Sequence, residues 1–313
     1  MTVNIEENYI KARKSQLKFY RDIPLYTKAG EYNFVLYKPT GITLGEMRIQ
    51  EGRHPDSLFI KSTDKLKGLQ EAQKAFNSQL EGYVKSGDPE KVKETLVTIV
   101  EETLMEPRSG GLEGVSDTVG ILISDYSKEV DIIRQLIDIS STDYSTVIHS
   151  INVMAFALGF ALYHHFSHAE TKTLGLAALL HDVGKTKIPI DILSAPRELT
   201  DVEFEVMKTH TTIGYQILNQ CQFKGKEIST VARDHHERID GSGYPNHEKD
   251  IMPMAQIVGI IDCYEALTND DRPYRNAMEG FKTFNQILKQ EVIRSKFSSE
   301  IYTQFVRSLE DEK

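Results

Sequence analysis

The chain has 313 residues, of which 40% are hydrophobic and 27% charged, as in ordinary soluble globular proteins. At about 150 residues per domain, this length accommodates one large and one smaller domain. The formal net charge of −9 argues against binding a nucleic-acid polymer, because such binding relies on many basic side chains. Two cysteines, Cys221 and Cys263, imply no disulfide framework, and neither a secretory signal nor an apolar run of ~18 residues is visible. We therefore expect a cytoplasmic protein that makes no use of a membrane.

Residues 1–110 predict a small α/β domain. Two stretches rich in β-branched and aromatic residues, EYNFVLYK (31–38) and SLFIKS (57–62), are typical of strands. Apolar residues at three- and four-residue spacings predict a helix from Lys65, and Pro89–Met105 predicts a second helix after a Ser-Gly-Asp-Pro break. We expect a linker at 106–114 and a regulatory or dimerisation role for this domain, with a homodimer as one outcome.

Residues 111–313 predict an all-helical domain, so the expected fold class is mainly α, with the small α/β domain in front. Long apolar-periodic runs occupy 121–139 and 143–164. Thr200 and Glu203 have the spacing of a capping box, which predicts a helix from there to about Cys221. Another helix is expected from Pro253, a residue tolerated in a first helical turn, to about Thr268.

Several titratable residues lie in apolar helical surroundings. Asp262 stands within IVGIIDCYEAL, and His181-Asp182 directly follow GLAALL. Burying such groups is costly unless they pair with one another or with a cation. A metal would satisfy the whole set together. The candidate ligands are His149, His181, Asp182, His210, His235, His236 and Asp262.

The donor types indicate the kind of metal centre. Imidazoles and carboxylates without a thiolate cluster suit iron, manganese or zinc better than magnesium or calcium. Seven ligands exceed what one ion takes, whereas two ions about 3.5–4 Å apart serve phosphoester hydrolysis. Asp182 is the natural bridge between them. A water held by both ions becomes hydroxide near neutral pH, so no protein nucleophile is required.

In order along residues 140–310, the motifs HDVGKTKIPIDIL, Lys208-Thr209-His210, HHERIDGSGYP and RPYR resemble those of the HD-GYP family. This family is a branch of the HD metal-dependent phosphohydrolases. The resemblance implies a helical fold and hydrolysis of the bacterial second messenger cyclic di-GMP at a di- or trinuclear centre. The implied metal is iron, with manganese as the alternative, and two ions per chain are expected.

The resemblance also implies roles for individual residues. One metal would be held by His149, His181, Asp182 and Asp262, and the second by Asp182, His210, His235 and His236. Asp182 and Lys185 would be catalytic, with the Lys185 ammonium near the scissile phosphate, where it offsets developing charge. Tyr244 of the GYP segment would contact substrate. Arg272 and Arg275 of RPYR would bind phosphate, for which guanidinium groups are well suited.

Three positions depart from the family pattern. Ser145 stands where trinuclear members have glutamate, which implies a dinuclear centre. Glu265 replaces a common aspartate, and the stretch before Arg272 has one extra residue. Two alternatives therefore stay open. The first is a metal-containing scaffold with little turnover, which binds either cyclic di-GMP or, through the GYP loop, a protein partner. The second is a phosphohydrolase that acts on another nucleotide. The complete GYP segment argues against the last, since generic HD hydrolases lack that loop.

Overall fold

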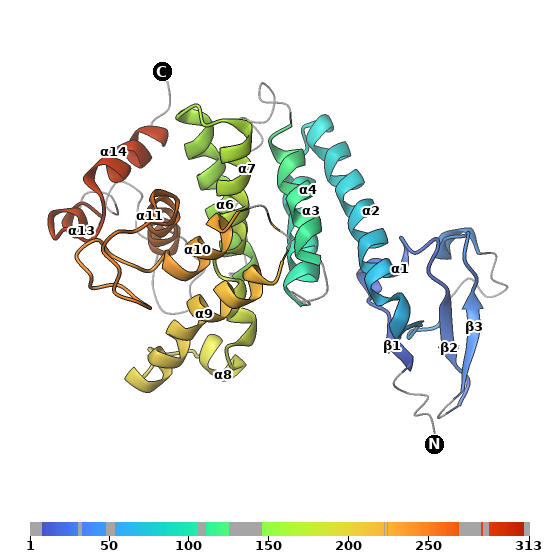
Figure 1. Ribbon diagram of the computed structural model, residues 1–313. Helices are drawn as coiled ribbons and strands as arrows, with labels where there is room; N and C mark the ends of the chain where they lie inside the picture. The colour runs from blue at the N-terminus through green and yellow to red at the C-terminus, as the bar shows by residue number, and fades with distance from the viewer. Residues whose placement is uncertain are drawn as a thin grey trace.

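A small sheet lies at one end of the molecule, and helices form the rest (Figure 1). The computed structural model describes residues 8–30, 33–47, 54–105, 111–124, 146–221, 223, 225–268, 283 and 288–309. The strands are β1 (Tyr9–Lys11), β2 (Leu25–Lys28), β3 (Phe34–Lys38) and β4 (Phe59–Lys61). They pair antiparallel in the order β1-β4-β2-β3. The predicted fold class, a small α/β part before a helical domain, is confirmed.

A half-buried polar cluster contributes to the contact between the sheet and the helices. The short helix α1 (Lys14–Leu17) follows β1, and just before it Arg13 pairs with Glu102 at 2.6 Å. Gln16 donates to the same carboxylate at 2.6 Å. Between β3 and β4 lies the 3-10 turn η2 (Leu44–Glu46), and η3 (Ser62–Asp64) follows β4. Because Glu102 belongs to a helix outside the sheet, these contacts fix the orientation of the sheet.

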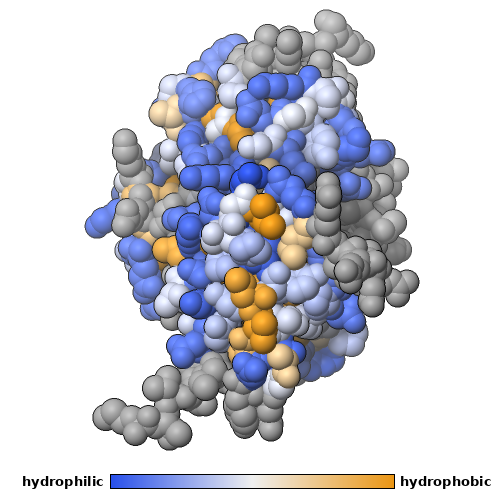
Figure 2. All heavy atoms as spheres, turned by 90° about the vertical axis from the view of Figure 1, so that its right-hand side faces the viewer, coloured by the Kyte–Doolittle hydropathy of each residue, from blue (hydrophilic) through white to orange (hydrophobic). Residues whose placement is uncertain are grey.

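The edge strand β3 exposes apolar residues. Val35 and Leu36 are 46% and 52% exposed, and β3 is the last strand of the sheet. Figure 2 looks onto this end of the molecule and shows a narrow apolar band on a largely hydrophilic face. Exposed apolar edge strands favour pairing with another chain.

Three helices connect the sheet to the remainder of the molecule. They are α2 (Lys65–Ser86), α3 (Pro89–Met105) and α4 (Gly111–Leu122), and they pack against one another. The bounds of α3 agree with the predicted helix. The linker prediction at 106–114 is wrong in part, because α4 begins at Gly111. Helix α3 contacts α6, and α4 contacts α7. The division into domains 1–110 and 111–313 stays a prediction.

The remaining helices form a bundle around one apolar core. Their bounds are α6 (Thr146–Tyr163), α7 (His168–Leu180), η4 (Val183–Lys187), α8 (Ile190–Leu193), α9 (Asp201–Asn219), α10 (Glu227–Asp234), α11 (Pro253–Thr268), α13 (Lys289–Ile293) and α14 (Ser299–Ser308). The capping box of Thr200 and Glu203 is present at the start of α9. The predicted run at 121–139 lies largely outside the described residues.

Helix α6 is the apolar centre of this bundle. It is long and apolar enough to cross a membrane, but 67% of its 18 residues are buried inside the protein, where it packs on α7, α11 and α14. Burial against other helices accounts for its composition, since a helix that is apolar all round is typical of a core position.

Candidate metal centre

The structure brings all seven predicted ligands together at the meeting point of several helices. His149 comes from α6, and His210 from α9. His181 and Asp182 follow the last residue of α7, His235 and His236 follow that of α10, and Asp262 comes from α11. Three sets of ligand atoms each lie within 4.8 Å of one another: His149, His181 and Asp182; His210, His235 and His236; and His181, His235 and Asp262.

Two glycines allow the helices to approach closely at this point. A Cβ on Gly184 of η4 would lie 1.9 Å from the carbonyl oxygen of His210 on α9. A Cβ on Gly259 of α11 would lie 2.3 Å from the carbonyl oxygen of His235 at the end of α10. Any side chain at either position would push a ligand-bearing segment away from the centre.

Asp182 faces two groups of imidazoles with its two carboxylate oxygens. Its Oδ2 lies 3.3 Å from Nε2 of His181 and 3.6 Å from Nε2 of His149. Its Oδ1 lies 3.2 Å from Nε2 of His210 and 3.9 Å from Nε2 of His235. The carboxylate therefore stands between two sets of potential ligands.

Asp262 is a second carboxylate near three of the imidazoles. Its Oδ1 lies 3.0 Å from Nε2 of His149 and 4.0 Å from Nε2 of His181. Its Oδ2 lies 3.9 Å from Nδ1 of His236. This second carboxylate adds negative charge to a cluster that is otherwise rich in imidazole.

The donor atoms fit a bound cation. The Nδ1 atoms of His181 and His210 lie 2.6 and 2.7 Å from the backbone carbonyls of Ala178 and Met207, and that of His235 lies 3.1 Å from the carbonyl of Val231. A carbonyl can only accept, so each Nδ1 donates its N–H, and in a neutral ring this leaves the Nε2 lone pair available to a metal. Within the described part of the chain, the Nε2 atoms of these three histidines and Oδ1 of Asp182 are buried and lack a hydrogen-bond partner. Buried, unpaired acceptors that converge are costly without a cation.

The protonation states of His235, His236 and Asp182 also suit metal binding. Burial, and then the neighbouring His181 and His210, lower the pKa of His235 to about 3. Burial, and then His235, hold the pKa of His236 well below its usual range. Both rings are thus neutral near pH 7, the form that binds metal. Burial alone would raise the pKa of Asp182, but Lys185 and His181 outweigh it and keep that pKa well below its usual range.

Glu265 is a buried member of this site that the sequence comparison treated only as a departure. Its Oε2 lies 2.5 Å from Nδ1 of His149, and its Oε1 accepts from Asn152 at 2.9 Å. Burial would lower the pKa of His149, but the charge of Glu265 and the hydrogen bond to Asp262 raise it to about 9. The spacing in the sequence could have identified Glu265 as a site residue. It stands three residues after Asp262, so both lie on one face of α11.

Lys185 and Tyr244 stand at the outer side of the cluster. The Nζ of Lys185, in η4, bonds Oδ2 of Asp182. The ring of Tyr244 lies 4.7 Å from that of His236, at an interplanar angle of 31°. The Tyr244-Pro245 peptide bond is cis. Ser145, Arg272 and Arg275 lie outside the described residues.

The loop that carries Tyr244 is held by a buried carboxylate, which sequence reasoning missed. Glu237 directly follows His236 and is 3% exposed. It accepts from the backbone N–H of Asn246 at 2.6 Å and from that of Glu248 at 3.1 Å. These two bonds join the end of α10 to the far side of the GYP segment.

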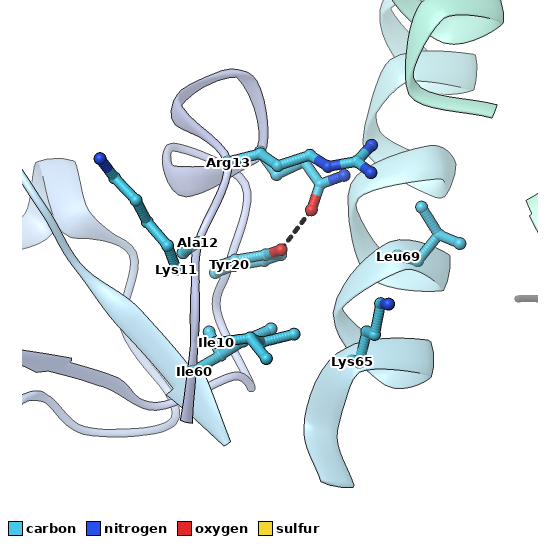
Figure 3. A pocket seen from close by; sticks show the side chains of 9 residues that line it. Ile10, Lys11, Ala12, Arg13, Tyr20, Ile60, Lys65 and Leu69 are labelled. Atoms are coloured by element: carbon cyan, nitrogen blue, oxygen red, sulfur yellow. Dashed lines mark hydrogen bonds between the residues drawn. The ribbon is translucent and has the colours of Figure 1, made fainter. Parts of the chain in front are cut away.

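A separate pocket lies in the N-terminal part, between β1, β4 and α2 (Figure 3). Its volume is about 160 Å³, with Ile10 and Ile60 in its lining. The hydroxyl of Tyr20 bonds the side-chain oxygen of Gln16 at its back. These polar groups are already satisfied, whereas the metal centre presents unsatisfied ligand atoms, so the metal centre is the stronger functional site.

A family model described as HD domain matches residues 131–293, which is more than half of the chain. A solved structure, an HDG"Y"P protein from Bdellovibrio bacteriovorus, has a similar fold with a TM-score of 0.59. It is 18% identical, and the match covers 96% of this chain and 99% of that one.

Curated relatives are phosphodiesterases of cyclic dinucleotides. A cyclic di-GMP phosphodiesterase of Pseudomonas aeruginosa is 30% identical over 62% of this chain and 46% of its own length. A cyclic di-GMP phosphodiesterase of Thermotoga maritima is 40% identical over 42% of this chain and 36% of its own. A 3'3'-cGAMP-specific phosphodiesterase of Vibrio cholerae is 35% identical over 44% of this chain and 32% of its own. The matched segments thus span less than half the length of each relative.

Proposed function

Because this chain belongs to the HD domain family, in its HD-GYP branch, we propose that it is a metal-dependent phosphodiesterase that hydrolyses cyclic di-GMP. The observation that carries the proposal is the position of Asp182. Its two oxygens face His149 and His181 on one side and His210 and His235 on the other. Such an arrangement suits one carboxylate shared by two metal ions.

The proposed centre holds two divalent ions, iron or alternatively manganese. His149, His181, Asp182 and Asp262 bind the first, and Asp182, His210, His235 and His236 bind the second. Nitrogen and oxygen donors of this kind suit these metals. When bound, the ions supply Lewis acidity that activates water and polarises the phosphoryl group. The net reaction adds one water across one P–O ester bond and opens the ring to a linear dinucleotide.

The chain's own side chains orient the substrate and balance its charge. Lys185 is 23% exposed on its side chain while it bonds Asp182, so its ammonium lies between the centre and solvent. This position suits contact with the scissile phosphate, whose oxygens gain charge in the transition state. Tyr244, whose ring lies beside that of His236 at an angle of 31°, contacts the nucleotide, and Arg272 and Arg275 remain the proposed phosphate-binding residues. A homodimer, a partner at the GYP loop and a cytoplasmic location stay predictions.

A turnover assay tests this proposal. The purified chain, loaded with Fe²⁺ or Mn²⁺ under reducing conditions, is incubated with cyclic di-GMP, and products are separated by chromatography. We expect the linear dinucleotide. Binding of cyclic di-GMP without product under both metals would support the scaffold alternative instead. The contact of Glu265 with His149 supports an intact metal centre, which both alternatives require.

A further inference from the structure

We infer that Phe204 and Lys208 of α9 form a base-binding edge of the site that recognises a guanine of the substrate. The inference rests on the proposed function and adds to it the residues that select the base. Neither residue is a metal ligand candidate. Both lie on the side of α9 that faces the GYP loop, four residues apart and therefore one above the other on the helix surface.

A continuous row of side chains leads from the metal centre to Phe204. The ring of His236, a proposed ligand, lies 4.7 Å from that of Tyr244. The Nζ of Lys208 lies 5.6 Å from the centre of the Tyr244 ring and 4.9 Å from that of Phe204. The Phe204 and Tyr244 rings lie 6.4 Å apart at 80°. Lys208 therefore stands between two aromatic rings at the border of the centre.

Exposure increases from His235 outward to Phe204, so this row leads from the buried cluster toward solvent. The side chain of His235 is fully buried, that of His236 is 20% exposed and that of Lys208 is 28% exposed. Phe204 is 45% exposed. Phe204 is paired with the Tyr244 ring, and aromatic side chains beside a few polar groups are the usual lining of a ligand site. A nucleotide whose phosphate reaches the centre would extend its base in this direction.

The chemistry of the row suits a guanine. An exposed aromatic ring provides a face on which a base stacks. The Lys208 ammonium is oriented by Glu205, whose Oε1 lies 2.7 Å from its Nζ. An ammonium donates to O6 and N7 of guanine, which are adjacent acceptors, whereas adenine has an amino group in place of O6. Phe204 would thus supply affinity for a base, and Lys208 the preference for guanine.

Equilibrium binding of a bis-phosphorothioate analogue of cyclic di-GMP to the metal-loaded chain tests the role of Phe204. We expect Phe204→Ala to raise the Kd about tenfold, as for loss of one stacked base, and Phe204→Trp to restore it. In turnover by Phe204→Ala, kcat/KM for cyclic di-GMP should fall about tenfold further than kcat/KM for methyl 4-nitrophenyl phosphate. This second substrate has no base to stack on Phe204, because its one ring is the leaving group. Metal content per chain reports that the centre is intact.

Lys208→Met tests selectivity. We expect the preference for cyclic di-GMP over cyclic di-AMP to fall about tenfold, the usual size of a base-edge contact. Val202→Ala, at another exposed apolar residue of α9, and Lys226→Met, which removes the same charge at the far end of α10, should change neither substrate's kinetics.

An unchanged Kd in Phe204→Ala, or an equal loss of kcat/KM with both substrates, would overturn the inference. The proposed function would still stand if the unmodified chain hydrolyses cyclic di-GMP. Unchanged selectivity in Lys208→Met would overturn the assignment to guanine. An unmodified chain that cleaves methyl 4-nitrophenyl phosphate but neither binds nor cleaves cyclic dinucleotides would overturn the proposed function, and the inference with it.

Discussion

Nδ1 of His149 lies 2.5 Å from Oε2 of Glu265, so a carboxylate on α11 orients an imidazole on α6. The same helix carries Asp262 one turn earlier, and Asp262 contacts the other nitrogen of that ring at 3.0 Å. His149 is therefore held on both sides by α11. Carboxylates that orient metal-binding histidines in this way raise the affinity of the site.

Removal of Glu265 should weaken metal binding without removing any proposed ligand. In Glu265→Ala, His149 loses the partner of Nδ1, and we expect metal affinity to fall about 10- to 100-fold. Glu265→Asp should retain part of that affinity, since it keeps the charge but shortens the side chain. Competition with a metal-binding dye measures both variants. Wild-type affinity in Glu265→Ala would show that the contact has no role in metal binding.

Asp182 should be required for both ions, and Lys185 for neither. We expect Asp182→Ala to lose the bound metal, because each oxygen serves a different set of imidazoles. Lys185→Met should retain it and lose turnover. Metal analysis of the purified chains distinguishes these outcomes, with Asp191→Ala, at an exposed acid of α8, as the matched control. Two ions retained in Asp182→Ala would contradict the bridging role.

Metal uptake should depend on pH through His149. Its pKa is raised to about 9, so in the metal-free chain the ring is protonated at pH 7 and must lose that proton to bind metal. The apparent affinity for Mn²⁺ should therefore rise between pH 7 and 8.5, by up to about tenfold per pH unit. Calorimetry in two buffers of different ionisation enthalpy measures the proton released. Binding without proton release at pH 7 would contradict this assignment.

Glu237 should determine the position of Tyr244. A glutamine has one acceptor oxygen and would turn an NH₂ group toward the second backbone N–H, so Glu237→Gln loses one charged hydrogen bond and weakens the other. We expect the free energy of unfolding to fall by about 1–3 kcal/mol and KM for the substrate to rise. Glu248→Gln, at an exposed carboxylate of the same loop, is the control. Equal behaviour of the two variants would rule out the role of Glu237.

The ligand set could be predicted because His181-Asp182 and Asp262 stand in apolar segments, and because His235 and His236 are adjacent in the chain. The starts of helices α3 and α11 could also be predicted from the sequence, since each helix begins at a proline. Strands β1 and β2 were missed because three or four residues show no clear alternation.

Contacts between separate elements could not be predicted in the same way. The bond from Glu265 to His149 joins α11 to α6, and the row from Lys208 to Tyr244 joins α9 to a loop. Such pairs depend on helix packing, which includes the close approach at Gly184. Local spacing indicated the residues that face inward but not their partners.

The most direct test of the central claim is to measure the metal content and the turnover of cyclic di-GMP on one preparation of the purified protein. The proposed function predicts two ions per chain and a linear dinucleotide product, both lost on chelation and both restored by Fe²⁺ or Mn²⁺. A chain that carries two ions, binds cyclic di-GMP and leaves it intact would contradict the proposal.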